Sequence, residues 1–207
     1  MSWAAFLLAS LVLAATPGPG VLYIVTRTLA QGRRVGLASV AGVALGNFGN
    51  ALAASLGVAA VLAISATAFS VLKWAGAVYL IWLGLKALRA APTGPLQAPE
   101  TAPDGRQVLF DGFWVALLNP KTALFFAAFL PQFVDHGGSA ALQSLRFGAA
   151  FVAIAATTDS LWVLAAALAA PWLRRHQGTH AAGRYATAAV FIGLGAYTAA
   201  SGPATGR

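Results

Sequence analysis

The 207-residue chain contains no cysteine and few charged residues. Without cysteine it has no disulfide framework, no thiolate metal site and no thiol redox centre. Only 9% of its residues are charged, whereas a soluble domain carries about 25%. Hydrophobic residues make up 59% of the chain and gather in runs long enough to cross a bilayer. The sequence therefore predicts an integral membrane protein.

Catalytic motifs are also missing. The three histidines, His136, His176 and His180, fall in predicted loops, and no phosphate loop, nucleophile–base pair or dinucleotide fingerprint is present. We predict that the protein is not an enzyme and has no cofactor, metal site or catalytic residue. The net charge of +8 lies on no basic helix face. We therefore predict no nucleic-acid partner and attribute the charge to membrane topology.

Six apolar spans are predicted, at residues 3–28, 36–64, 68–88, 113–134, 147–172 and 185–200. A proline-rich stretch at 91–107 cannot continue a helix and indicates a hinge between two halves. We expect a first half at 1–90, a linker at 91–110, a second half at 111–201 and a short tail at 202–207.

The basic residues fall unequally on the two sides of these spans. Nine follow spans one, three and five: Arg27, Arg33, Arg34, Lys86, Arg89, Arg106, Arg174, Arg175 and Arg184. Only Lys73, Arg146 and Arg207 lie on the other side. The positive-inside bias predicts that the linker is cytoplasmic and both termini are outside, in a multi-pass protein of the cytoplasmic (inner) membrane.

Proline interrupts one span in each half. The first interruption reads Thr16-Pro17-Gly18-Pro19-Gly20, and the second reads Asn119-Pro120-Lys121-Thr122. A helix breaks or kinks at proline, and inside a bilayer the freed backbone groups must be buried or line a polar cavity. Halves of three spans each have opposite orientations, as in an inverted repeat, and paired breaks mark a transporter's solute site. The rest of the overlay between the halves is poor.

We therefore predict an all-α membrane protein of six transmembrane helices, arranged as two inverted three-helix repeats whose first helix is broken. After Pro19 the restarting helix presents free amides and a positive dipole end, which suit a carboxylate or phosphate. Gly18 and Gly20 leave room for a ligand to approach the backbone. The candidate binding residues are Thr16, Pro17, Gly18, Pro19, Gly20, Asn50, Asn119, Pro120 and Lys121. A structural kink is the alternative for the broken helix.

Lys121 and Asp159 are the charges placed inside spans. A cation there costs at least ~2.5–3.5 kcal/mol, so we expect Lys121 to face the interior and hold a substrate carboxylate or an acid. Snorkelling is the alternative, although Lys121 lies about 12 Å deep. Asp159 is interpreted as the one acid deep in a span, and is assigned to coupling or ammonium binding. Its alternative is a structural carboxyl that is hydrogen-bonded to Thr157, to Thr158 or to a neighbouring helix.

The second span carries a stripe of small residues that includes Gly42 and Gly46, four apart. Such a stripe indicates a helix-packing seam. Asn50 continues the seam at mid-span, where it is placed to hydrogen-bond a solute. Asn47, on a neighbouring stripe, is a weaker candidate.

The breaks and their flanks resemble the LysE/RhtB family of amino-acid exporters. The matching segments run in order through nearly the whole chain: residues 15–20, 32–36, 41–46, 73–84, 112–121 and 129–134. The resemblance implies six spans and export of amino acids from the cytoplasm, driven by the proton gradient. Family members often have histidine or another polar residue near the position of Asn50, and Asp159 matches no family motif.

The sequence thus predicts an exporter of small neutral amino acids that works by alternating access. Its expected partners are the amino-acid substrate, protons as coupling ion and the lipid bilayer. A divalent-cation exporter and a membrane scaffold or assembly factor without transport are the alternatives. The oligomeric state stays open, a homodimer included.

Overall fold

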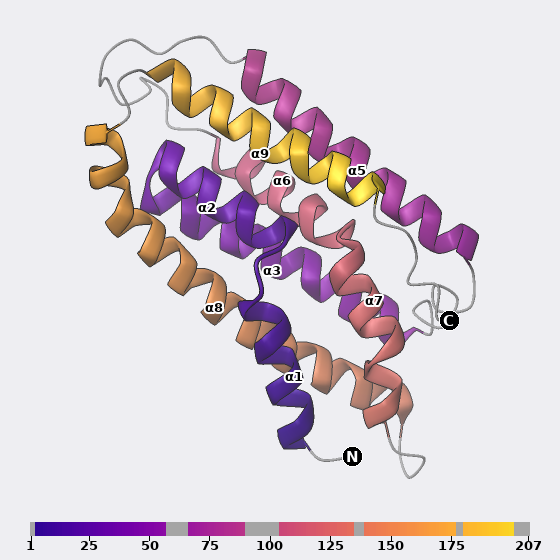
Figure 1. Ribbon diagram of the computed structural model, residues 1–207. Helices are drawn as coiled ribbons and strands as arrows, with labels where there is room; N and C mark the ends of the chain where they lie inside the picture. Colours follow the sequence, from indigo (N-terminus) through magenta and orange to yellow (C-terminus); the bar gives the residue numbers. More distant parts are fainter. Residues whose placement is uncertain (1–2, 57–65, 90–103, 135–138, 177–179, 201–207) are drawn as a thin grey trace.

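The computed structural model describes residues 3–56, 66–89, 104–134, 139–176 and 180–200, and these contain helices and no strand (Figure 1). The elements are α1 (Trp3–Ala15), α2 (Pro19–Gln31), α3 (Arg33–Ser55), α5 (Ala66–Arg89), α6 (Gly105–Leu117), α7 (Pro120–Ala128), the 3₁₀ turn η1 (Leu130–Phe133), α8 (Ala140–His176) and α9 (His180–Ala200). The all-α prediction is confirmed.

Several helices have the length and apolarity needed to cross a bilayer. Within the described residues, α3 and the part of α8 from Ala140 to Pro171 qualify by themselves. The pair α1 and α2 qualifies as one span with a bend of 47°. Shorter apolar stretches lie within α5 and α9.

Both predicted breaks are present. α1 ends at Ala15 and α2 begins at Pro19, while α6 ends at Leu117 and α7 begins at Pro120. Each restarting helix has proline at its first position, where a missing N–H costs no hydrogen bond.

The helix before the second break begins earlier than predicted. We expected it to start at Phe113, but α6 begins at Gly105 because Asp104 caps it, accepting a hydrogen bond from the Arg106 amide at 3.0 Å. The predicted linker at 91–110 therefore overlaps the first turns of α6, and its residues 91–103 lie outside the described part of the chain.

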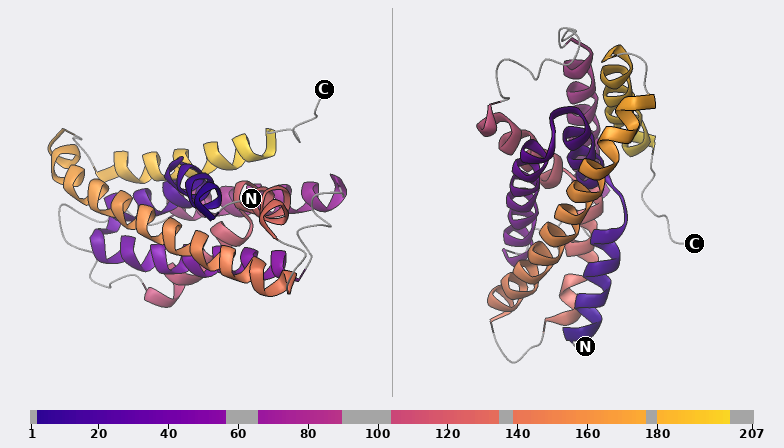
Figure 2. Two further views of the ribbon diagram at one scale, coloured as in Figure 1. Left: turned by 90° about the horizontal axis from the view of Figure 1, so that it is seen from below. Right: turned by 90° about the vertical axis from the view of Figure 1, so that its left-hand side faces the viewer.

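The bundle is built on close helix pairs. α5 packs along α9, and α3 packs against both α6 and α8 (Figures 1 and 2). A Cβ added at Gly42 would overlap the carbonyl oxygen of Leu109, and one added at Gly46 would overlap that of Phe113. The small-residue stripe of α3 is thus a packing seam against α6, as predicted.

Two apolar cores lie along the bundle. One gathers Tyr23, Ile24, Val43, Leu80 and Phe191 from α2, α3, α5 and α9. The other is aromatic and joins Phe6 of α1 to Phe133 and Phe147, with ring centroids 5.3 and 4.7 Å away.

One set of helix ends gathers at a single end of the elongated bundle. The turn between α2 and α3, the end of α5, the start of α6, the end of α8 and the start of α9 gather at the upper left of Figure 1, away from the N-terminus. This is the end that the distribution of basic residues assigns to the cytoplasm.

Candidate functional site

A small cavity lies between the two helix breaks. Its volume is about 40 Å³, which is room for a few water molecules at about 10–15 Å³ each. Six of the predicted residues line it: Thr16, Gly18, Gly20, Asn119, Lys121 and Asp159. The other lining residues are Asn47 and Thr122, together with the apolar Leu13, Ala14, Val21, Val43, Ala116, Phe151 and Ala155. The fold therefore brings both breaks and both predicted charges to one space.

The two restarting helices present different N-termini to this cavity. At α7 the Asn119 side chain accepts a hydrogen bond from the Lys121 amide at 3.0 Å, so that first turn is capped. At α2 the cap position is Gly18, in extended conformation, and no side chain caps the helix. The amides of the first turn of a helix have no partner within the helix. Of the two helix starts, that of α2 is therefore the one without a side-chain cap on its first-turn amides.

The Lys121 ammonium bridges the breaks. Its Nζ donates to the carbonyl oxygens of Leu13 at 2.9 Å and Thr16 at 2.6 Å, at the C-terminal end of α1. Carbonyls at a helix end lack intrahelical partners and form the negative end of the dipole. Lys121 thus has backbone oxygens as its direct partners, where the sequence predicted a substrate carboxylate or an acid.

Asp159 reaches the same cavity from the middle of α8, with only 5% of its surface exposed. It interacts electrostatically with Lys121. The neighbouring hydroxyls donate their hydrogen bonds to backbone carbonyls of α8. Thr157 donates to the Ala153 carbonyl at 2.8 Å, and Thr158 donates to the Ala155 carbonyl at 2.9 Å. These two hydroxyls therefore do not donate to the Asp159 carboxyl.

Four predicted residues lie away from the cavity lining: Pro17, Pro19, Asn50 and Pro120. Asn50 donates to the Ala116 carbonyl at 2.9 Å, and Asn47, the weaker candidate, takes the lining position. Pro120 and Pro19 line a neighbouring crevice with Asn119. Pro17 lines neither space.

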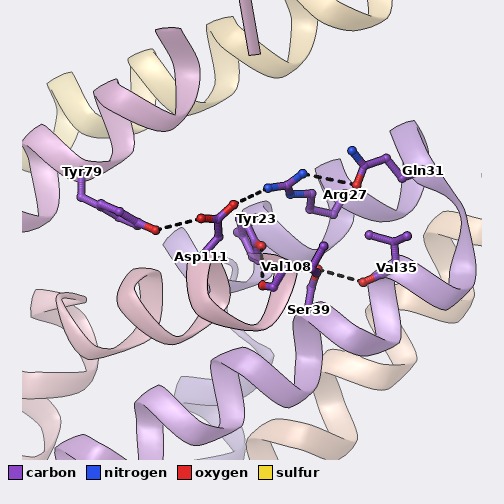
Figure 3. Close-up of polar contacts among 8 residues, drawn as sticks. All are labelled: Tyr23, Arg27, Gln31, Val35, Ser39, Tyr79, Val108 and Asp111. Carbon is purple, nitrogen blue, oxygen red and sulfur yellow. Dashed lines mark hydrogen bonds and ion pairs between the residues drawn. The ribbon is translucent and has the colours of Figure 1, made fainter. Parts of the chain in front are cut away.

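Sequence reasoning missed a second buried ionic cluster (Figure 3). Asp111 of α6 is 1% exposed, and its Oδ2 lies 2.7 Å from Nη2 of Arg27 on α2. Its Oδ1 accepts a hydrogen bond from the Tyr79 hydroxyl of α5 at 3.3 Å. Asp111 precedes the predicted start of the fourth span at Phe113, so the prediction counts only Asp159 as a deep acid, whereas the structure buries both carboxylates. The available signal was an acid at the seventh residue of an apolar helix that begins at Gly105, after the capping residue Asp104.

Further contacts fix the cluster in place. The Arg27 guanidinium lies 5.4 Å from the Tyr23 ring centroid and donates to Gln31 at 3.3 Å (Figure 3). The Tyr23 hydroxyl donates to the Val108 carbonyl at 3.0 Å. The cluster therefore joins α2 and α5 of the first half to α6 of the second.

Metal ligands are not gathered in the described parts of the chain, where no group of three or more His, Cys, Asp or Glu side chains could hold an ion. The polar chemistry available near the breaks is therefore that of one ammonium, one carboxyl, two amides and free helix-end groups.

Comparison with known proteins agrees with the family resemblance. The family model described as LysE type translocator matches residues 11–202. The homoserine/homoserine lactone efflux protein of Salmonella typhimurium is 31% identical over 83% of this chain and 84% of its own length. The leucine efflux protein of Klebsiella pneumoniae is 26% identical over 95% of this chain and 93% of its own.

A third relative, an uncharacterized membrane protein of Vibrio cholerae, is 35% identical over 64% of this chain and 65% of its own length. No solved structure matches. The match through both breaks and nearly all described helices confirms the resemblance and the membrane character of the fold. The chain belongs to the LysE type translocator family.

Proposed function

We propose that the protein exports small neutral amino acids from the cytoplasm, with the cavity between the helix breaks as its substrate site. The observation that carries this proposal is the convergence of an uncapped helix start, a lysine and a buried acid on one space. An amino acid at neutral pH carries one carboxylate and one ammonium, which match these groups in kind.

The charges at the site favour a zwitterion. Lys121 and Asp159 together contribute no net charge, so a substrate without net charge leaves the buried site balanced. Lysine or arginine as substrate would bring an extra cation, and a buried unpaired charge is costly. The walls near Val21, Val43 and Phe151 are apolar and suit an aliphatic side chain. Homoserine and leucine, named in the relatives' descriptions, are therefore the first substrates to test.

The size and surroundings of the cavity support transport by alternating access. At about 40 Å³ it is too small for an amino acid, so the helices must separate for loading and release. The Arg27–Asp111 cluster closes the end that we assign to the cytoplasm, and the phenylalanines around Phe6 close the opposite end. Opening either end in turn would expose the cavity to one side of the membrane. Two inverted three-helix halves, with both termini outside the cytoplasmic membrane, supply that motion.

Proton coupling is assigned to Asp159. It is the buried acid that faces the cavity, and buried acids within membranes serve as proton carriers in pumps and transporters. Protonation of Asp159 would release a bound ammonium group, which links proton entry to substrate release.

Amino-acid efflux from dipeptide-fed cells tests the function. Cells with and without the protein are loaded with homoserine- or leucine-containing dipeptides, and the free amino acid outside is measured over time. We expect faster efflux with the protein, abolished by Asp159→Asn and retained by Ser160→Ala, one residue along α8. A protonophore should slow efflux by the wild type. If efflux is the same with and without the protein, in both variants and with the protonophore, and protein levels are normal, the result would instead favour the membrane scaffold or assembly factor.

A further inference from the structure

The C-terminal end of α1 holds a cation. Carbonyl oxygens of Leu13 and Thr16 accept hydrogen bonds from the Lys121 ammonium at 2.9 and 2.6 Å. The Val12 carbonyl, one position earlier, already accepts from the Thr16 amide at 3.1 Å and hydroxyl at 2.7 Å. The oxygens that accept from Lys121 are therefore carbonyls without a partner within the helix, at the C-terminal, negative end of the α1 dipole.

The lysine reaches this position from the other half of the chain. Its backbone amide is held by Asn119 in the first turn of α7, and its side chain extends past Gly18. A Cβ at Gly18 would lie 3.3 Å from Lys121 Cδ and 3.5 Å from Nζ. Glycine at the break thus gives the lysine its path, and one ammonium joins two breaks that are about a hundred residues apart in sequence.

We infer that the broken end of α1 is a seat for a primary ammonium group, filled by Lys121 in the empty transporter and by the substrate's α-ammonium during transport. The second clause rests on the proposed function. An ammonium has three donors and no acceptor, which suits a site made of carbonyl oxygens beside the Asp159 carboxyl.

An exchange of this kind leaves neither the Lys121 ammonium nor the two α1 carbonyls unpaired. When a zwitterion enters, its ammonium takes the Leu13 and Thr16 carbonyls, and the released Lys121 ammonium pairs with its carboxylate. The uncapped amides at the start of α2 are placed to share that carboxylate. The Lys121 ammonium and the Leu13 and Thr16 carbonyls therefore have a partner before and after binding, and no covalent bond is made or broken. A substrate whose nitrogen is acylated cannot take part.

A permanent structural tether is the competing account of the same contacts. In that case Lys121 would stay on the α1 carbonyls throughout transport, and the substrate's ammonium would never reach them. The two accounts therefore agree on the affinity of the carbonyls for an ammonium ion and differ in whether a substrate ammonium replaces Lys121 in the wild type.

Rescue by a free ammonium ion tests the seat without any transport measurement. Lys121→Ala removes a fragment equivalent to propylammonium, so purified Lys121→Ala protein is titrated with propylammonium chloride while its thermal midpoint is followed. We expect a saturable rise of about 3–5 °C at ten times Kd. Tetramethylammonium, which has no N–H donor, should give no such rise. Wild type, whose seat is full, and Lys121→Met, whose side chain fills the space, should not respond to propylammonium.

An equal change in the thermal midpoint of Lys121→Ala with propylammonium and with tetramethylammonium would contradict the inference that the end of α1 binds a primary ammonium group. If this variant folds too poorly to purify, the recovered folded yield becomes the readout: propylammonium present during purification should restore it, and tetramethylammonium should not. Equal yields with the two ions would again contradict the inference.

The substrate's use of the seat is tested separately with the wild type. Leucine should raise the thermal midpoint and be exported, whereas N-acetylleucine should do neither. Export of both at equal rates would overturn the substrate part while leaving amino-acid export standing. Failure of efflux together with a positive propylammonium response would instead contradict the proposed function and retain the seat.

Discussion

Arg27 and Asp111 are in direct contact, 2.7 Å apart, whereas Lys121 and Asp159 face the same cavity from two helices. Both pairs join a basic and an acidic residue in the interior of an apolar bundle. The first pair is also contacted by Tyr79, which donates a hydrogen bond to Asp111, and by the Tyr23 ring, which lies beside Arg27. The second leaves room for water, and its lysine is bonded to backbone oxygens instead of the acid.

This difference separates a fixed ionic contact from one that can exchange partners. A buried pair in direct contact is lost only when the helices that carry it separate. A lysine held by carbonyls beside an acid that lines the same cavity can change partner with little rearrangement. We therefore assign closure of the cytoplasmic end to the Arg27–Asp111 cluster and substrate exchange to the cavity. The predictions below test that division.

The largest effect on stability is expected from Asp111→Asn. Removing one partner of a buried ion pair leaves an uncompensated charge and costs about 3–5 kcal/mol. We expect a large loss of folded protein in detergent, measured by size-exclusion chromatography and thermal unfolding. Asp159→Asn is the matched control and should leave the thermal midpoint nearly unchanged. Equal midpoints for the two variants would remove the distinction between the clusters.

The effect of Asp159→Asn should appear in transport instead. We expect its initial efflux rate to fall at least a hundredfold, a barrier change of about 2.7 kcal/mol, because the variant can neither ionise nor carry a proton. Efflux from cells with matched protein levels measures this. A rate within a factor of two of wild type would mean that Asp159 has a structural role only.

Glycines near the two regions should respond differently to alanine. Gly42→Ala forces a Cβ onto the Leu109 carbonyl in the α3–α6 seam and should cost about 1–3 kcal/mol. At Gly20, beside the cavity, a Cβ would make an ordinary contact 3.5 Å from Val43. We expect Gly20→Ala to fold like wild type. Denaturation of both variants in the same detergent makes the comparison, and a more damaging Gly20→Ala would contradict it.

The smallest effect is expected at Asn50. Asn50→Ala removes the hydrogen bond to the Ala116 carbonyl and should cost about 1 kcal/mol of unfolding free energy. Because Asn50 does not line the cavity, the concentration of substrate that gives half-maximal efflux should not change. A several-fold shift in that concentration would return Asn50 to the substrate site.

The features predicted from the sequence are those set by local chemistry. Proline and glycine fix where the spans break, so both interruptions and the approach of Lys121 and Asp159 to them could be anticipated. The small residues around Gly42 likewise indicated close helix packing. Each of these depends on residue type within one or two helical turns.

What the sequence did not give depends on contacts between distant segments. The pairing of Arg27 with Asp111 joins residues that are 84 positions apart in the sequence. Asp111 also precedes Phe113, the predicted start of the fourth span, so it was not expected to be buried. The choice between Asn47 and Asn50 depends on how α3 is rotated against α6. The partner of Lys121 depends on where the end of α1 lies relative to α7, which no local pattern specifies.

Substrate protection of an introduced cysteine tests the central claim most directly, because the chain has no cysteine of its own. Asn47→Cys places a thiol in the cavity, and Asn50→Cys places one three residues away against α6. Purified variants are treated with a small, charged thiol reagent, with and without leucine or homoserine. We expect either amino acid to slow labelling of Asn47→Cys several-fold and to leave Asn50→Cys unaffected. Labelling of Asn47→Cys at the same rate with and without an amino acid that this variant exports would contradict the assignment of the cavity as the substrate site.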